Sequence, residues 1–204
     1  MLASRPAHAD VELAVGAGVG VNFFRSLPTL TSERVETSAR TLEAQEVPLG
    51  GSVTAFGGSF DIGVVFDDRW MLHGFGVGLW GAVGSYPAIV TGVDGSIARA
   101  RPWTMFDVDL TLPGVGYRVK RRRWMFGAGI RTGVSIMHVG ASIAAGGGAQ
   151  ETSLTGVSAM LQAELEACRR LDPVTRVCLH VAPRIFDFGI LNGGTLGLRM
   201  EWGR

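Results

Sequence analysis

Charged side chains in this chain occur singly among small residues, at spacings that place many of them on one face of alternating segments. The acids in this set are Glu12, Asp61, Asp107, Asp109, Glu164, Glu166 and Glu201, the bases are Arg131, Arg184 and Arg199, and His180 lies nearby. Buried charges are costly unless they are paired, so an enclosed face of this kind should form a network of ion pairs and water. Two functions fit such a network: a narrow or gated ion path, or a polar plug. A narrow interior filled by side chains favours the plug.

Histidine near serine is the next chemistry to weigh, because an imidazole that removes a hydroxyl proton makes serine a nucleophile. His138 stands three residues after Ser135 and four before Ser142. Neither offset matches the two-residue spacing that would let the base reach the nucleophile on a regular strand. We therefore predict no catalytic residue and interpret His138 as an interfacial residue near a strand end. His73, beside a turn, receives the same interpretation.

The two cysteines, Cys168 and Cys178, flank a predicted tight turn and fall on the same face. A symmetric hairpin sets them opposite each other, and an oxidising envelope compartment would permit a disulfide. Two thiols that only fill the interior remain the alternative, since opposed strand residues do not always have disulfide geometry. A metal site with His180 as third ligand lacks the usual ligand spacing, so we predict neither a metal nor a cofactor.

The element that must position these residues is best seen in the stretch from Val11 to Phe23. Apolar residues occupy every second position there, and glycine, alanine, glutamate and asparagine lie between them. Thirteen residues at about 3.3 Å each extend to roughly 43 Å, which is long enough to cross a bilayer at the usual tilt of a barrel strand. A typical soluble strand has about half that length.

The same period of two predicts seven further strands. They are expected at Ser52–Phe66, Met71–Ser85, Phe106–Val119, Trp124–Ile136, Val157–Ala167, Val177–Ile185 and Leu196–Trp202. Two of them break phase: Pro113-Gly114 indicates a bulge, and between Trp70 and Ser85 the large residues fall on both faces. The stretch Val157–Ala167 also fits a helix by composition. We predict a strand there from its context.

Connections alternate between tight and long. Tight turns are expected at Asp67–Arg69, Lys120–Arg123 and Asp172–Pro173, and polar loops at Arg25–Gly50, Tyr86–Trp103, Ala141–Thr152 and Asp187–Gly193, with a helical turn within Ser32–Gln45. Aromatic residues gather at the strand ends. Phe66, Trp70, Tyr117, Trp124 and Trp202 lie at the turn end, and Phe23 and Phe106 at the opposite end. Such girdles are typical of a membrane barrel.

Composition agrees with this reading. Charged residues make up 18% of the chain, below the roughly 25% of globular domains, and glycine is about twice as frequent as average. No run of about 18 apolar residues occurs, which argues against a helical span, and a net charge of +1 gives no indication of nucleic-acid binding. Ala7-His8-Ala9 resembles a signal-peptidase site, so we interpret residues 1–9 as a signal-peptide remnant or disordered terminus and 10–204 as one barrel domain.

The pattern over Asp10 to Arg204 resembles the small eight-stranded outer-membrane β-barrels, such as the OmpA transmembrane domain and the OmpX type. Leu196, Leu198, Met200 and Trp202 are similar to that group's C-terminal assembly signal, although Gly203 and Arg204 follow the final aromatic residue. The resemblance implies an all-β, eight-stranded, antiparallel up-and-down transmembrane barrel in the outer membrane of a Gram-negative bacterium. Its expected partners are outer-membrane lipid, lipopolysaccharide and another envelope protein bound through the external loops, and it is expected to be a monomer.

Function is left open between classes. A structural, adhesive or partner-binding role carried by the external loops is the first hypothesis. Some barrels of this group modify lipid A, so a deacylase-like enzyme with a site near His138 is the second. A soluble lipocalin-like ligand-binding barrel is the third, but its outer face would be polar. The residues between the apolar positions here are mainly small, as expected for the wall of a narrow lumen.

Overall fold

The computed structural model describes residues 11–24, 30–32, 35–37, 40–42, 53–67, 69–83, 88–91, 97–145, 148–186 and 193–203. The expected signal-peptide remnant at residues 1–9 lies outside these ranges. Among the described residues, no helix has the length and hydropathy needed to cross a membrane.

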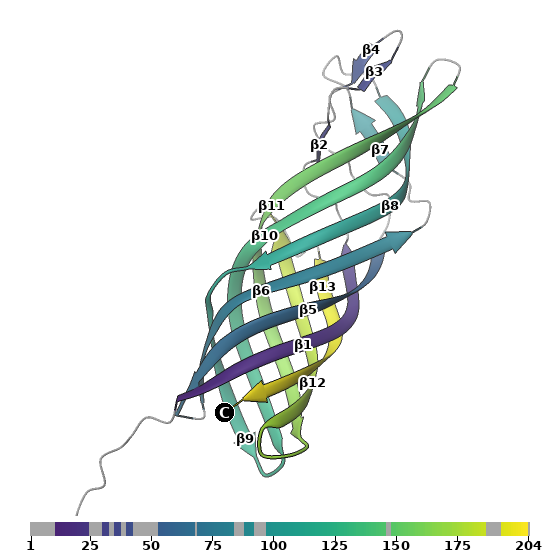
Figure 1. Cartoon of the computed structure of the whole chain (residues 1–204). Coiled ribbons are helices and arrows are strands. Elements are labelled where there is room, and N and C mark those ends of the chain that lie inside the picture. Colours follow the sequence, from purple (N-terminus) through teal and green to yellow (C-terminus); the bar gives the residue numbers. More distant parts are fainter. Residues whose placement is uncertain are drawn as a thin grey trace, which may run out of the picture.

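Within the described ranges, a closed antiparallel barrel of eight strands forms the body of the molecule when β8 and β9 are taken as one interrupted strand (Figure 1). The barrel strands are β1 (Val11–Phe24), β5 (Val53–Phe66), β6 (Trp70–Val83), β8 (Ile97–Thr111), β9 (Gly114–Arg121), β10 (Trp124–Ala145), β11 (Gly148–Arg170), β12 (Thr175–Phe186) and β13 (Gly193–Gly203). Each strand pairs with its sequence neighbour, and β1 closes the ring by pairing with β13, with Gly16 opposite Glu201. The predicted fold class is confirmed.

The three predicted tight turns lie together at the end of the barrel where β1 begins and the chain finishes (Figure 1). Asp67 and Arg122 adopt positive φ angles of 50° and 54°, a backbone conformation that is common in tight hairpin turns. Asp172 supports the third turn by accepting hydrogen bonds from the backbone N–H groups of Val174 and Thr175. We call this end of the barrel the turn end, and the opposite end the outer end.

The outer end corrects three expectations. Residues expected to be loop extend the wall instead: β8 begins at Ile97 and pairs with β7 (Ala88–Thr91), and β10 and β11 pair as far as Ala145 and Gly148. Within Ser32–Gln45 the described residues include β3 (Val35–Thr37) and β4 (Arg40–Leu42), a small hairpin where a helical turn was expected. β2 (Leu30–Ser32) adds to the edge of β11. The strand predicted at 157–167, where composition also fitted a helix, lies within β11.

Two irregularities explain the broken phases. In β6 an extra residue at Gly74-Phe75 lies opposite Ile62 of β5. At the same level, Leu112-Pro113 separates β8 from β9, as the predicted bulge at Pro113-Gly114 required. Each irregularity exchanges the inward and outward positions of its strand, so Trp70 and Leu72 face outward although Trp80 is buried inside.

The outer wall of the barrel is apolar. Exposed apolar residues occupy alternate positions along the strands. They include Val19, Phe60, Leu79, Leu110, Ile130, Leu165 and Leu198. The girdle residues are likewise exposed: Phe66, Trp70, Tyr117, Trp124, Trp202, Phe23 and Phe106. Phe106, expected at a strand end, lies within β8 because that strand continues to Ile97. Trp70 packs edge-on against Tyr117 with ring centroids 5.0 Å apart. A wall of this kind is matched to lipid and not to water.

Candidate functional site in the lumen

The polar positions of the strands point into the lumen and form three linked clusters. The turn-end cluster contains Glu12, Arg118, Glu166, Arg176 and Glu201. The central cluster contains Asp61, His73, Arg131, Glu164, His180 and Arg199. The outer cluster contains Trp80, Asp107, Asp109, Ser135, Gln162 and Arg184. Together they account for all eleven lumen residues that the sequence indicated.

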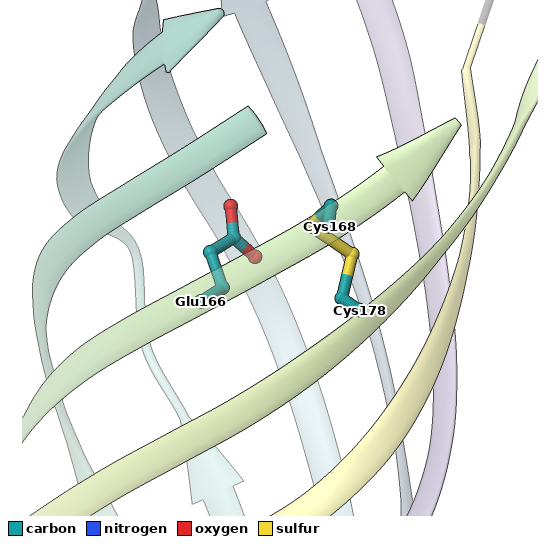
Figure 2. A group of neighbouring side chains, drawn as sticks. All are labelled: Glu166, Cys168 and Cys178. Atoms are coloured by element: carbon teal, nitrogen blue, oxygen red, sulfur yellow. A yellow bond between two sulfur atoms is a disulfide. The ribbon is translucent and has the colours of Figure 1, made fainter. Parts of the chain in front are cut away.

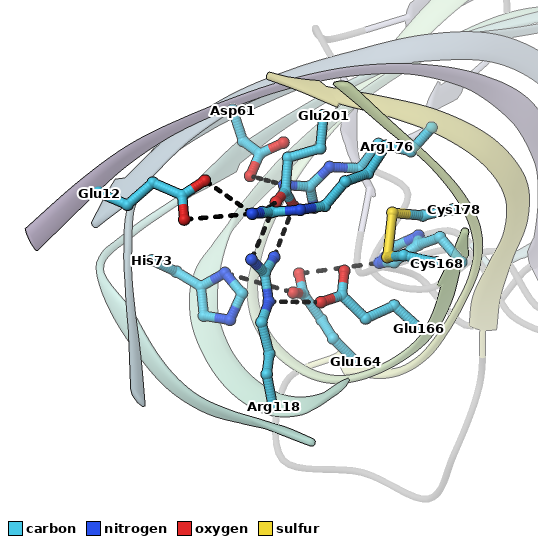
Figure 3. A network of polar contacts seen from close by, with 12 residues as sticks. Glu12, Asp61, His73, Arg118, Glu164, Glu166, Cys168, Arg176, Cys178 and Glu201 are labelled. Atoms are coloured by element: carbon cyan, nitrogen blue, oxygen red, sulfur yellow. Dashed lines mark hydrogen bonds and ion pairs between the residues drawn. A yellow bond between two sulfur atoms is a disulfide. The ribbon is translucent and has the colours of Figure 1, made fainter. Parts of the chain in front are cut away.

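Glu201 is the hub of the turn-end cluster (Figure 3). Its two carboxylate oxygens accept hydrogen bonds from both terminal nitrogens of Arg118, at 2.9 and 2.5 Å, and Oε1 also accepts one from Arg176 at 2.7 Å. Arg118 Nε reaches Glu166 at 2.8 Å, and Arg176 reaches Glu12 at 2.8 Å. Arg176 thus joins Glu12 of β1 to Glu201 of β13, the two strands that close the barrel.

The central cluster is more loosely joined. Asp61 lies 2.9 Å from Arg199 Nη2 and 3.3 Å from Arg131 Nη2. Glu164 lies 3.3 Å from Arg131, 3.6 Å from His73 Nδ1 and 4.0 Å from His180 Nε2. Several of these contacts are ion pairs without hydrogen-bond geometry, since His73 Nδ1, His180 Nε2 and Arg199 Nη2 have no hydrogen-bond partner.

The outer cluster is centred on Asp109, whose Oδ2 accepts hydrogen bonds from Arg184 Nη1 at 2.5 Å and from Trp80 Nε1 at 2.7 Å. Arg184 also donates to Gln162 and lies over the Trp80 ring. Asp107 accepts a hydrogen bond from Ser135 at 2.6 Å. The inward position of Trp80, which the bulge in β6 creates, makes this cluster possible.

Glycines on the lumen wall leave room for these long side chains to extend across the lumen. A β-carbon on Gly16 would overlap the guanidinium of Arg199, and one on Gly127 would overlap Glu166. A β-carbon on either Gly116 or Gly129 would lie 2.8 Å from His73 Nε2. The glycine-rich reverse faces of the strands therefore hold the charge network within a narrow barrel.

Two small cavities lie in the lumen. One cavity of about 40 Å³ lies between the central and outer clusters and is lined by residues that include Asp61, Asp109, Thr111, Arg131 and Arg199. A second cavity of about 10 Å³ lies beside His73 and Arg118. Since a water molecule needs roughly 10 to 15 Å³ by this measure, the two together would hold only a few waters.

Arg118, Arg176 and His73 are lumen residues that were absent from the predicted network. For Arg118 the signal was available, because the phase change at Pro113 puts the residue between Tyr117 and Val119 on the inner face. Arg176 precedes the predicted start of its strand by one residue. His73 faces inward only because of the bulge in β6, which no residue type announces.

Cys168 and Cys178 lie opposite each other in β11 and β12 and are joined by a disulfide. Glu166 lies beside them, so that its carboxylate and the two sulfurs form a compact group (Figure 2). The three atoms have the proximity of metal ligands, but a disulfide supplies no thiolate to bind a metal. The group is part of the turn end of the lumen.

Of the residues weighed for acyl chemistry, His138 and Ser135 lie on different faces of β10. Ser135 is fully buried in the lumen and donates to Asp107. His138 faces outward, and its Nδ1 lies 2.9 Å from the Thr155 hydroxyl on β11. A base and a nucleophile on opposite sides of the wall cannot exchange a proton directly, so His138 and Ser135 do not form a catalytic pair.

No family model and no curated protein sequence matches this chain. Among solved structures, it is similar to Neisserial surface protein A, at 12% identity and a TM-score of 0.46, with 95% of this chain and 97% of that chain covered. It is also similar to the outer membrane protein OprG from Pseudomonas aeruginosa, at 10% identity and a TM-score of 0.48, covering 97% of each chain. A third is Ail, the attachment invasion locus protein of Yersinia pestis, at 11% identity and a TM-score of 0.46, covering 96% and 99%.

The chain's own strand pairing and the apolar outer wall establish that it has the fold of a small outer-membrane β-barrel.

Proposed function

We propose that this chain is an integral protein of the outer membrane of a Gram-negative bacterium, with a structural, adhesive or partner-binding role carried by its outer hairpins. The observation that carries this proposal is the inverted polarity of the barrel. Apolar and aromatic side chains cover the outside, and arginines and carboxylates with exposures of a few per cent fill the inside. A soluble barrel would need the opposite arrangement.

Cell fractionation tests the location, and gel migration tests the barrel. The protein should be recovered with outer membranes, should need detergent for solubility, and should migrate differently on a gel when it is not boiled. Recovery in a soluble fraction without detergent would contradict the proposal and would favour the lipocalin-like alternative.

We further propose that the lumen network is a plug and not an ion path. Ion pairs cross the lumen at three levels, and the cavities between them have volumes of only about 40 and 10 Å³. Protein reconstituted in planar lipid bilayers should show no steady conductance. Resolved single-channel steps that disappear in a protein-free control would contradict the plug.

The outer hairpins, formed by the outer ends of β10 and β11 and by β7 with β8, are suited to a binding role because they are paired strands. β10 and β11 have 22 and 23 residues, and their pairing continues to the outer tip, while β2 and β7 add short edges beside them. Paired strands hold a binding surface more firmly than an irregular loop does.

A hairpin deletion tests this role. Cells that carry the chain with residues 141–152 replaced by a two-residue turn should keep the barrel in the outer membrane, and they should lose cell–cell aggregation or adhesion to matrix-coated surfaces. Equal adhesion by cells with the full chain and cells without the protein would contradict an adhesive role.

A further inference from the structure

A row of two arginines and one tryptophan crosses three adjacent strands at the turn end. Arg121 of β9 pairs with Trp124 of β10, and Trp124 pairs on its other side with Arg169 of β11. All three residues are exposed and share the outward phase of Val119, Phe126 and Leu165. Neighbouring strands lie about 4.8 Å apart, so the two arginine backbones stand about 10 Å apart with the indole between them.

The two arginines of this row are unpaired within the described ranges of the chain. Neither the Arg121 nor the Arg169 side chain has an ion pair or hydrogen bond among the residues that the structure describes. Arg170, by contrast, is tied to the carbonyl oxygens of Asp172 and Pro173. The Asp172 carboxylate, the acid in that turn, is occupied by backbone N–H groups that hold its pKa below its usual range.

The next two rows of outward-facing residues across β9, β10 and β11, counted toward the middle of the wall, are apolar. The first joins Val119, Phe126 and Ala167, and the second joins Tyr117, Ala128 and Leu165. The Trp124 ring stacks on that of Phe126, with centroids 6.5 Å apart. The row therefore stands at the border between a polar end and an apolar wall, where a lipid has its phosphate above its acyl chains.

We propose that Arg121 and Arg169, on either side of Trp124, bind the phosphate of an anionic phospholipid in the leaflet at the turn end. Guanidinium groups match phosphate oxygens with paired N–H donors, and an indole is favoured at the depth of lipid headgroups. The two apolar rows would contact the acyl chains. A free phosphate would gain nothing from those rows, so the arrangement favours a lipid. This proposal rests on the membrane location proposed above.

Native mass spectrometry of the refolded protein in detergent can measure the binding. Phosphatidylglycerol is titrated into wild type and into the double variant Arg121→Gln/Arg169→Gln. Phosphatidylethanolamine serves as the lipid control, and glycerol phosphate supplies the headgroup without chains. A matched variant, Arg122→Asn/Arg123→Gln, removes the same charge from the adjacent turn and keeps a residue that tolerates positive φ at position 122.

Each arginine near a lipid surface contributes about fivefold to affinity, so the Arg121/Arg169 variant should bind phosphatidylglycerol about 25-fold more weakly than wild type. The turn variant should stay within about twofold, and phosphatidylethanolamine should bind weakly to all three. An equal loss in both variants would show diffuse charge attraction and overturn the site. Binding of glycerol phosphate as tight as that of the lipid would overturn the assignment to lipid.

Unboiled gel migration of each variant is measured on the same samples. A folded, heat-modifiable barrel without lipid selectivity would refute this site and leave the membrane location standing. A soluble protein that needs no detergent would refute the membrane location itself.

Discussion

The turn-end and central clusters of the lumen are both built on arginines and carboxylates, and the central cluster adds His73 and His180, but the two clusters differ in how completely their polar atoms are paired. In the turn-end cluster, the buried side-chain nitrogen and oxygen atoms all have hydrogen-bond partners. In the central and outer regions, atoms of His73, Thr111, Arg131, His180 and Arg199 have none. All of these residues except His73 line the larger cavity. At the turn end, Arg118 of β9 and Arg176 of β12 both donate hydrogen bonds to Glu201 of β13. In the centre, Glu164 has three charged or titratable neighbours, but at 3.3 to 4.0 Å.

The turn-end cluster should therefore contribute more to the stability of the barrel than the central region, which borders a cavity large enough for water. A buried charge that loses its partner is strongly destabilising, so a saturated cluster acts as a clamp. Polar atoms beside a cavity can be served by water, so single changes there should cost less. The comparison predicts a graded series of effects.

Glu201→Gln should have the largest effect. It removes the charge that pairs with both Arg118 and Arg176, and it should lower the free energy of unfolding by about 3–5 kcal/mol. Urea unfolding in detergent micelles, followed by tryptophan fluorescence, measures this loss. Glu12→Gln, at the partly open rim, should cost less than about 1 kcal/mol. Equal costs for the two variants would show that Glu201 is not a hub.

Removal of the disulfide should have the next largest effect. Cys168→Ala/Cys178→Ala opens a loop whose ends are 10 residues apart, which corresponds to about 2–3 kcal/mol in the chain-entropy description. Unfolding of the wild type with and without reducing agent gives an independent value. A variant as stable as the oxidised wild type would show that the turn-end clamp does not depend on the covalent link.

Gly16→Val should cost about 1–3 kcal/mol, since the new side chain would push the Arg199 guanidinium away from Asp61. Gly81→Ala is the control, because a β-carbon there meets only the Met105 carbonyl oxygen, 3.8 Å away. Both variants can be compared by thermal unfolding in lipid nanodiscs. Equal melting temperatures would mean that Arg199 moves freely in the central lumen.

Thr111→Val should have the smallest effect, within about 0.5 kcal/mol, because the Thr111 hydroxyl has no partner and valine keeps its shape. Ser135→Ala, which deprives Asp107 of a hydrogen bond, should cost about 1–2 kcal/mol. A larger loss from Thr111→Val than from Ser135→Ala would contradict the expectation that polar atoms beside the cavity tolerate single changes.

Much of the barrel was predictable from sequence because strand periodicity is a local signal. In Val11–Phe24, alternate residues identify the inner and outer faces of the strand. The positions of the tight turns follow from their turn-forming residues. The ion pairs were not predictable, because the register between neighbouring strands determines which charged residues lie at the same level of the lumen. Arg118 and Glu201 are 83 positions apart in sequence, and nothing in either strand names the other.

The outer end was predicted least well. Ala141–Thr152 is rich in glycine and small residues, which favour a loop by propensity, yet the register that begins at Trp124 and Arg169 continues through it. Pairing already established along a hairpin carries weakly favourable residues into the sheet. Local composition does not contain that information.

The two irregularities at Gly74-Phe75 and Leu112-Pro113 lie level with each other on neighbouring strands and so form one joint across the wall. On the turn-end side of this joint, odd-numbered residues of β6 such as His73 face inward. On the outer side, even-numbered residues such as Trp80 do so. Loss of one residue at either place would turn half a strand inside out and put Trp80 or His73 into lipid. Insertions and deletions at these two points are therefore coupled, and a homologue that lacks one extra residue should lack the other as well.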